Sequence, residues 1–184
     1  CVINAHGESS IKPLCQLLAA FAIPSISIYD GDVKAGYAAS ATRFFTKELC
    51  FEIEVVKTLY DAGRQDLVKE IALELDSKIT TVPLDFDLVS KHFTKMGVEL
   101  YSETKCEKCG HTTKTKDASS YTPKLLSDVD DNDREEFCLM YSALFMAKKS
   151  VLLGRIIGEK LPADNIPACY TDAIKKAQEV ASNA

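Results

Sequence analysis

The chain has 184 residues, a net charge of −5, 46% hydrophobic residues and 27% charged residues. This length and composition are typical of one globular domain, with or without a small appendage. No apolar run approaches the roughly 20 residues of a membrane span, which argues against a membrane protein, and the negative charge argues against broad electrostatic capture of nucleic acid.

The seven cysteines indicate a reducing compartment. An odd number of cysteines without a secretory signal fits the cytoplasm better than a disulfide framework, so we expect a cytoplasmic location. Most of these cysteines are expected to act as small core residues or as zinc ligands. The chain begins with Cys1 in place of Met, which suggests a piece of a longer protein.

The first 32 residues predict a β-α-β unit. Cys1–Ala5 is short, apolar and β-branched, as a buried parallel strand should be. Gly7 permits a tight turn, and apolar residues recur at helical spacing over Lys12–Phe21. A second strand is expected at Ser25–Tyr29. Parallel strands of such a unit end at the same edge of the sheet, where ligands of open α/β sheets usually bind.

That edge collects the first candidate site residues. His6, Glu8 and Ser10 follow the first strand, and Asp30 and Asp32 follow the second. Carboxylates crowded in this way repel one another unless a cation is present, so the pattern favours a hard-metal site. The alternatives are that the two aspartates cap a turn, that the histidine is structural and that the glutamate is solvated.

The middle of the chain is read mainly as helices. Gly63 is the expected stop between two of them. In chain order, we expect a loop at Val33–Ser40, a short helix or irregular segment at Thr42–Cys50, helices at Phe51–Ala62 and Arg64–Leu75, a strand at Ile79–Val82 and a helix at Leu84–Met96.

Residues 98–122 change character and predict a polar hairpin or a zinc-knuckle-like excursion. Cys106, Cys109 and His111 form one half of a zinc-binding pattern, whereas a closed structural zinc site needs four ligands. A distant cysteine or a second chain would supply the fourth ligand, and a metal-free hairpin is the alternative. The basic residues of this segment would contact a phosphate backbone or remain solvated; they are Lys105, Lys108, Lys114 and Lys116.

The last third is acidic at first and then helical. The run Asp128–Asp133 lacks the central glycine and the closing glutamate of a calcium loop, so we expect a solvated run that ends in a helix cap. A long helical pattern covers Arg134–Leu161. Pro162 and Pro167 interrupt it, and Tyr170–Ala181 predicts a final amphipathic helix.

Four motifs together resemble the Toprim domain of OLD-family (overcoming lysogenization defect) endonucleases. They are the turn His6-Gly7-Glu8-Ser9-Ser10, the Asp30-Gly31-Asp32 strand end, Phe51-Glu52, and Lys148-Lys149 followed by Gly154-Arg155. The likeness covers residues 1–97 and 123–184, with 98–122 as an insertion. It implies an α/β fold with a small sheet of about four parallel strands flanked by helices, and cleavage of DNA phosphodiesters with Mg²⁺ or Mn²⁺.

The resemblance also implies roles for individual residues. Metal would be held by His6, Glu8, Asp30, Asp32 and Glu52, and the catalytic set would be Glu8, Asp30, Asp32 and Lys149. His6 and Ser10 occupy the two positions where the family usually has acids, and imidazole suits Mn²⁺ or Zn²⁺ better than Mg²⁺. Glu8 would then replace a lost carboxylate. An ordinary first-turn acid and a surface lysine are the alternatives for Glu52 and Lys149.

The leading hypothesis is therefore a divalent-metal-dependent DNA endonuclease domain. Its expected partners are DNA, an ATPase domain in the same chain or in a partner, and a homo-oligomer. One alternative is a catalytically degenerate Toprim domain that binds DNA or protein. Another is a small-molecule phosphotransfer domain, which the lack of a glycine-rich phosphate loop disfavours.

Overall fold

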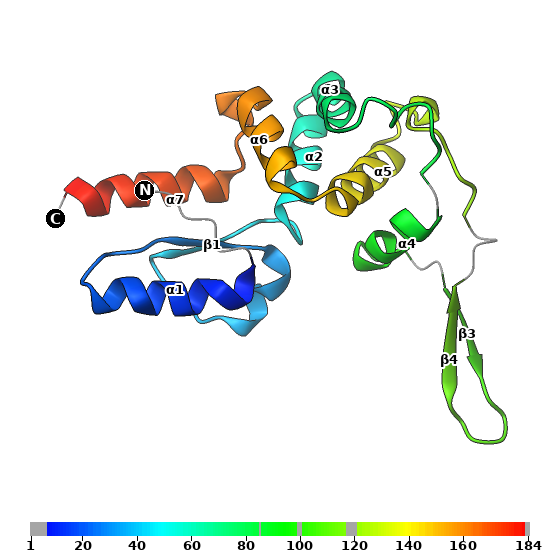
Figure 1. The fold of residues 1–184 in the computed structure, drawn as a ribbon, viewed down its shortest axis with the longest axis horizontal. Coiled ribbons are helices and arrows are strands. Elements are labelled where there is room, and N and C mark those ends of the chain that lie inside the picture. Colours follow the sequence, from blue (N-terminus) through cyan, green and yellow to red (C-terminus); the bar gives the residue numbers. More distant parts are fainter. Residues whose placement is uncertain (1–6, 85, 99–100, 117–120, 183–184) are drawn as a thin grey trace. The chain divides into compact units, whose positions relative to one another are not determined.

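The computed structural model describes residues 7–84, 86–98, 101–116 and 121–182 (Figure 1). The predicted strand Cys1–Ala5 and the candidate ligand His6 lie outside these residues. The chain divides into two compact units, Cys1–Val55 with Pro162–Ala184, and Val56–Leu161. The segment 98–122, predicted as an excursion, belongs to the second unit.

The first unit contains a parallel pair of strands, β1 (Ser27–Tyr29) and β2 (Arg43–Phe45). Ser27 is paired with Arg43 and Tyr29 with Phe45. The connection between the strands contains the 3₁₀ helix η1 (Gly31–Gly36) where a loop was predicted. The mixed α/β class is confirmed, but the sheet has two parallel strands within the described residues, whereas the resemblance implied about four.

Helices α1 (Glu8–Ala20) and α7 (Ala168–Ser182) accompany this strand pair. Helix α1 contacts β1, and α7 contacts both strands. In Figure 1 the strands lie between the two helices. Helix α1 begins four residues before the predicted start at Lys12, with Pro13 inside it.

Two predictions of local structure were wrong. The segment Thr42–Cys50 contains the strand β2 where a helix or an irregular segment was expected. Ile79–Val82, predicted as a strand, is a turn in which Ile79 is buried at 6% exposure. Apolar side chains are buried in turns as well as in strands, so a short apolar run in the sequence does not distinguish a strand from a buried turn.

The second unit is built mainly of helices. Its elements are α3 (Gln65–Leu75), α4 (Phe86–Lys95), the 3₁₀ helix η3 (Leu126–Asp128), α5 (Arg134–Ala147) and α6 (Val151–Lys160). Helix α5 contacts α3 and α4, and α3 also contacts α6. The side chains of Phe137, Leu144 and Phe145 on α5 are fully buried, which places this helix at the centre of the core.

Individual capping and helix-terminating residues explain where these helices begin and end. Helix α2 (Phe51–Asp61) crosses the boundary between the two units, and Gly63, at φ +69°, separates it from α3 as predicted. The single pattern predicted over Arg134–Leu161 is two helices. Ser150 caps the second of them by accepting a hydrogen bond from the Leu153 amide at 3.2 Å.

Residues 101–116 form the predicted hairpin. Strands β3 (Tyr101–Lys105) and β4 (Thr112–Lys116) pair antiparallel, and Lys105 opposite Thr112 is the last pair before the turn.

The 3₁₀ helix η4 (Ala163–Asn165) precedes α7. Within the described ranges, no helix combines the length and the apolar character of a bilayer span.

Candidate functional site

The turn Asp30-Gly31-Asp32 leaves the carboxyl end of β1 and is held against the segment that joins β2 to α2. The Gly31 amide donates to Oγ1 of Thr46 at 2.7 Å, and this hydroxyl donates to the Glu48 carbonyl at 2.8 Å. The Asp32 amide donates to the Leu49 carbonyl at 3.2 Å. Because Thr46 is 3% exposed, its two hydrogen bonds are shielded from water, and together with the bond from the Asp32 amide they fix the backbone between the two aspartates.

Gly31 is required by this packing. A Cβ atom at this position would lie 2.2 Å from the Glu48 carbonyl oxygen and 2.7 Å from that of Thr46. Both neighbours are backbone atoms, which cannot move aside as a flexible side chain can. Backbone packing therefore explains why a glycine stands between the two aspartates, whether or not a metal binds there.

Asp30 and Glu52 come from two elements that are joined through the hydrogen bonds of the Thr46–Leu49 segment. Burial, the main cause, raises the pKa of the Cys50 thiol to about 11, and the carboxylates of Glu52 and Asp30 contribute. The same two carboxylates help to raise the pKa of Tyr170, again mainly through burial. The Tyr170 ring lies 5.0 Å from that of Phe51. Asp30 at the end of β1 and Glu52 at the start of α2 therefore both contribute to the electrostatic surroundings of Cys50 and Tyr170.

Glu54 is a buried acid that the sequence reasoning missed. Its side chain is 5% exposed, and Oε2 accepts hydrogen bonds from the amides of Lys47 at 2.6 Å and Glu48 at 3.4 Å. Glu54 thus fixes the segment Thr46–Glu48, and this segment binds the Asp30-Gly31-Asp32 turn through Thr46. The signal in the sequence was the second carboxylate in Phe51-Glu52-Ile53-Glu54.

Glu8 is engaged elsewhere in the first unit. The Tyr37 hydroxyl donates a hydrogen bond to Oε1 of Glu8 at 2.5 Å, and this bond is the main cause that raises the pKa of Tyr37 to about 12. The Tyr37 ring lies 4.8 Å from that of Tyr29 and 6.0 Å from that of Phe45, and the Arg43 guanidinium lies 4.9 Å from its centre. This contact was not predicted.

Ser10 and Lys149 have separate positions. Ser10 lies in the first turn of α1, where its amide donates to the Gly7 carbonyl at 3.2 Å. Lys149 lies between α5 and α6 and belongs to the second unit, whereas the aspartates belong to the first. The neighbouring Lys148 pairs with Asp76 at 3.4 Å.

The predicted metal ligands match magnesium or manganese by donor chemistry, because Asp30, Asp32 and Glu52 all offer carboxylate oxygens. In the part of the chain that the structure describes, however, no three His, Cys, Asp or Glu side chains are arranged so that they could hold a metal. No protein-family model, curated protein or solved structure matches this chain.

A second candidate site lies at the turn of the β3–β4 hairpin. Cys106 and Cys109 are exposed free thiols. Hydrogen bonds from the Cys109 amide, the Cys109 thiol and the Lys108 amide to the Cys106 sulfur lower the pKa of Cys106. The Cys106 amide donates to the His111 carbonyl and the Gly110 amide donates to the Cys106 carbonyl, both at 2.8 Å.

The acidic run that superficially resembled a calcium loop has structural roles. Asp133 caps α5, since its Oδ1 accepts a hydrogen bond from the Glu136 amide at 3.0 Å. Asp131 pairs with Lys69 at 2.5 Å. The predicted helix cap is thus confirmed.

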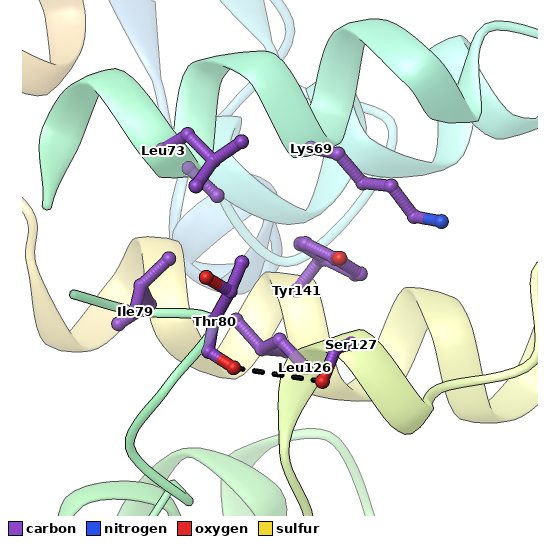
Figure 2. Close-up of a pocket in the computed structure, with 8 residues that line it drawn as sticks. Lys69, Leu73, Ile79, Thr80, Leu126, Ser127 and Tyr141 are labelled. Carbon is purple, nitrogen blue, oxygen red and sulfur yellow. Dashed lines mark hydrogen bonds between the residues drawn. The ribbon is translucent and has the colours of Figure 1, made fainter. Parts of the chain in front are cut away.

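The second unit also has a pocket of about 260 Å³ (Figure 2). Figure 2 shows Lys69 and Tyr141 toward one end of this pocket and Leu73 and Ile79 toward the other. The Ser127 hydroxyl donates to the Thr80 carbonyl at 3.5 Å across the lining. None of the predicted metal ligands lines it.

Proposed function

We propose that the chain is a divalent-metal-dependent DNA endonuclease domain, similar in kind to the Toprim domain of OLD-family proteins. The proposal is carried by one observation: the turn that bears Asp30 and Asp32, at the carboxyl end of β1, is hydrogen-bonded to the Thr46–Leu49 segment, which leads directly into the start of α2 and Glu52. The carboxyl end of parallel strands is the usual ligand-binding edge of α/β folds, which supports this assignment.

The roles follow from the placement of each side chain. Asp30, Asp32 and Glu52 would hold Mg²⁺ or Mn²⁺, and the hydrogen bonds of Thr46 would keep the turn that carries the aspartates in place. A metal bound there would stabilise charge on the oxygens of the phosphodiester. Lys149 would neutralise phosphate charge, as the resemblance implies.

Glu8 has a conditional role in this proposal. Its carboxylate accepts the hydrogen bond of Tyr37, and it would have to leave that partner to become a metal ligand. The main metal-binding role therefore falls on Asp30 and Asp32. DNA and an ATPase domain remain the proposed partners, and the cytoplasm the proposed compartment.

A second candidate is a module that binds DNA or protein without cutting. The engagement of Glu8 with Tyr37 favours it, and so does a serine at position 10 where the family usually has an acid. Both observations lower the number of carboxylates that the first turn offers to a metal.

Plasmid cleavage separates the two candidates. Supercoiled DNA is incubated with the chain in Mg²⁺ or Mn²⁺, beside an Asp30→Asn/Asp32→Asn variant and a matched Asp66→Asn/Asp164→Asn control that removes two exposed acids elsewhere. The endonuclease proposal expects metal-dependent nicking that falls by at least about 100-fold in the first variant and persists in the control.

Two results would count against an endonuclease. Nicking that survives in the Asp30→Asn/Asp32→Asn protein would belong to another site or to a contaminant. Retention of DNA in a mobility-shift assay, with no cleavage in either metal, would identify the binding module.

A further inference from the structure

The turn between β3 and β4 presents two thiols on a constrained backbone. The hydrogen bond from the Cys106 amide to the His111 carbonyl closes the turn directly after the last strand pair. Gly110 has φ +70°, a conformation that favours glycine, and its amide donates to the Cys106 carbonyl. The spacing and the backbone shape are therefore both specified.

The two cysteines lie on one tight turn. The Gly110 amide donates to the Cys106 carbonyl at 2.8 Å, which brings the two ends of the Cys106–Gly110 segment together, and both thiols are exposed. The thiolate is the form of cysteine that binds metal. Zinc is the common structural partner of paired cysteine thiolates, and its binding releases the thiol protons to solvent.

The turn supplies only half of a closed zinc site. Structural zinc is held by four ligands, and no third ligand joins this pair within the described residues. Three other cysteines are buried in the cores of the two units and cannot reach an exposed turn without unfolding; they are Cys50, Cys138 and Cys169. Cys15 is half-buried on α1, so loss of zinc in a Cys15→Ser variant would identify it as a ligand from the same chain and would overturn a shared site.

We propose that two copies of this chain share one Zn²⁺ through Cys106 and Cys109 of each copy, so that the hairpin turns meet end to end. Such a contact is symmetric, with the same two residues contributed by each copy. Zinc with four thiolates is negatively charged, and the two lysines beside the cysteines, Lys105 and Lys108, outnumber the single acid Glu107. The surrounding charge therefore stabilises the shared centre. The assignment is independent of nuclease activity.

The test measures zinc content and mass on the full chain under reducing conditions. Titration with ZnCl₂ is expected to saturate at one zinc per two chains, and sedimentation is expected to show a doubling of mass that a chelator reverses. Both effects should disappear in Cys106→Ser/Cys109→Ser and persist in the matched control Cys15→Ser, which changes a cysteine on α1. Cobalt in place of zinc should give the absorption of a tetrahedral four-thiolate site.

Three further results would overturn the proposal. The first is one zinc per chain without a change of mass, which identifies a site closed within one chain. The second is loss of zinc in His111→Ala, because the shared site does not use this imidazole. The third is no zinc uptake at all. Unchanged thermal unfolding of the Cys106→Ser/Cys109→Ser variant in chelator would exclude misfolding as the cause of its defects.

Discussion

The Tyr37 hydroxyl lies 2.5 Å from Oε1 of Glu8 and donates a hydrogen bond to it. Glu8 is in the first turn of α1, and the N-cap residue of this helix, Gly7, has no side chain with which to cap it. Tyr37 follows η1, and its ring packs at a tilt against the last residues of both parallel strands, Tyr29 and Phe45. This contact joins the start of α1 to the strand pair. It also engages the carboxylate of Glu8, which was predicted to bind metal.

The Glu8 contact predicts the titration of Tyr37. The tyrosine pKa is raised from 10.0 to about 12, mainly by the hydrogen bond to Glu8. The raised value means that the contact stabilises the fold fully below pH 10 and that this contribution is lost as the pH rises through about 12. NMR of ¹³C-labelled tyrosine, assigned with Tyr37→Phe, should show the high midpoint in the native chain. A midpoint that does not fall toward 10 in Glu8→Gln would show that Glu8 is not its cause.

Gly31→Ala should destabilise the first unit. The added Cβ would meet two backbone carbonyl oxygens, and overpacking of this kind costs about 1–3 kcal/mol or more. Gly36→Ala is the matched control, because a Cβ atom there meets nothing within 4 Å. Urea unfolding of both variants measures the difference. Equal stability of the two would mean that the turn does not lie against the Thr46–Glu48 segment.

Asp133→Ala should weaken the start of α5. Loss of the hydrogen bond to the Glu136 amide is expected to cost about 1 kcal/mol, whereas Asp133→Asn keeps a capping oxygen and should cost less. Thermal or urea unfolding compares the two variants with the native chain. If both variants were equally destabilised, the charge of Asp133 and not its capping geometry would be responsible.

The thiols should separate into two classes of reactivity. Cys106 is exposed and its pKa is lowered by its hydrogen bonds, whereas burial raises the pKa of Cys50 to about 11 and of Cys169 to about 12. Thiolates are the reactive form, so brief alkylation at neutral pH should modify Cys106 first. Peptide mass spectrometry measures the order. Faster modification of Cys50 would indicate that its segment opens in solution.

Local signals explain the parts of the fold that could be predicted. The helices on either side of Gly63 follow from apolar periodicity and a glycine stop, and the hairpin follows from polar strand residues around a Cys-rich turn. These signals act within a few residues, so they can be read from the chain without knowledge of distant contacts.

The missed features depend on partners far away in the chain. Strand β2 is three residues long, too short for a periodic signal, and it is defined by pairing with β1. The break between α5 and α6 has a local cause instead: Ser150 caps α6 by accepting from the Leu153 amide, and it was missed because it lies inside a continuous apolar pattern.

The sequence predicted the local features of the candidate site but not its contacts between residues distant in the chain. Asp30 was expected at a strand end and directly follows the last residue of β1. The pairing of Glu8 with Tyr37 spans 29 residues and left no pattern in the sequence. Neither short-range propensity nor spacing reports such a contact.

The arrangement of the first unit has a consequence for synthesis on the ribosome. Its strands β1 and β2 are translated before the second unit, yet the helix that contacts both of them, α7, is translated after it. The second unit is continuous from Val56 to Leu161 and has all its residues before α7 emerges. Domains generally fold as units during translation, so the second unit should fold first and the strand pair should wait for α7.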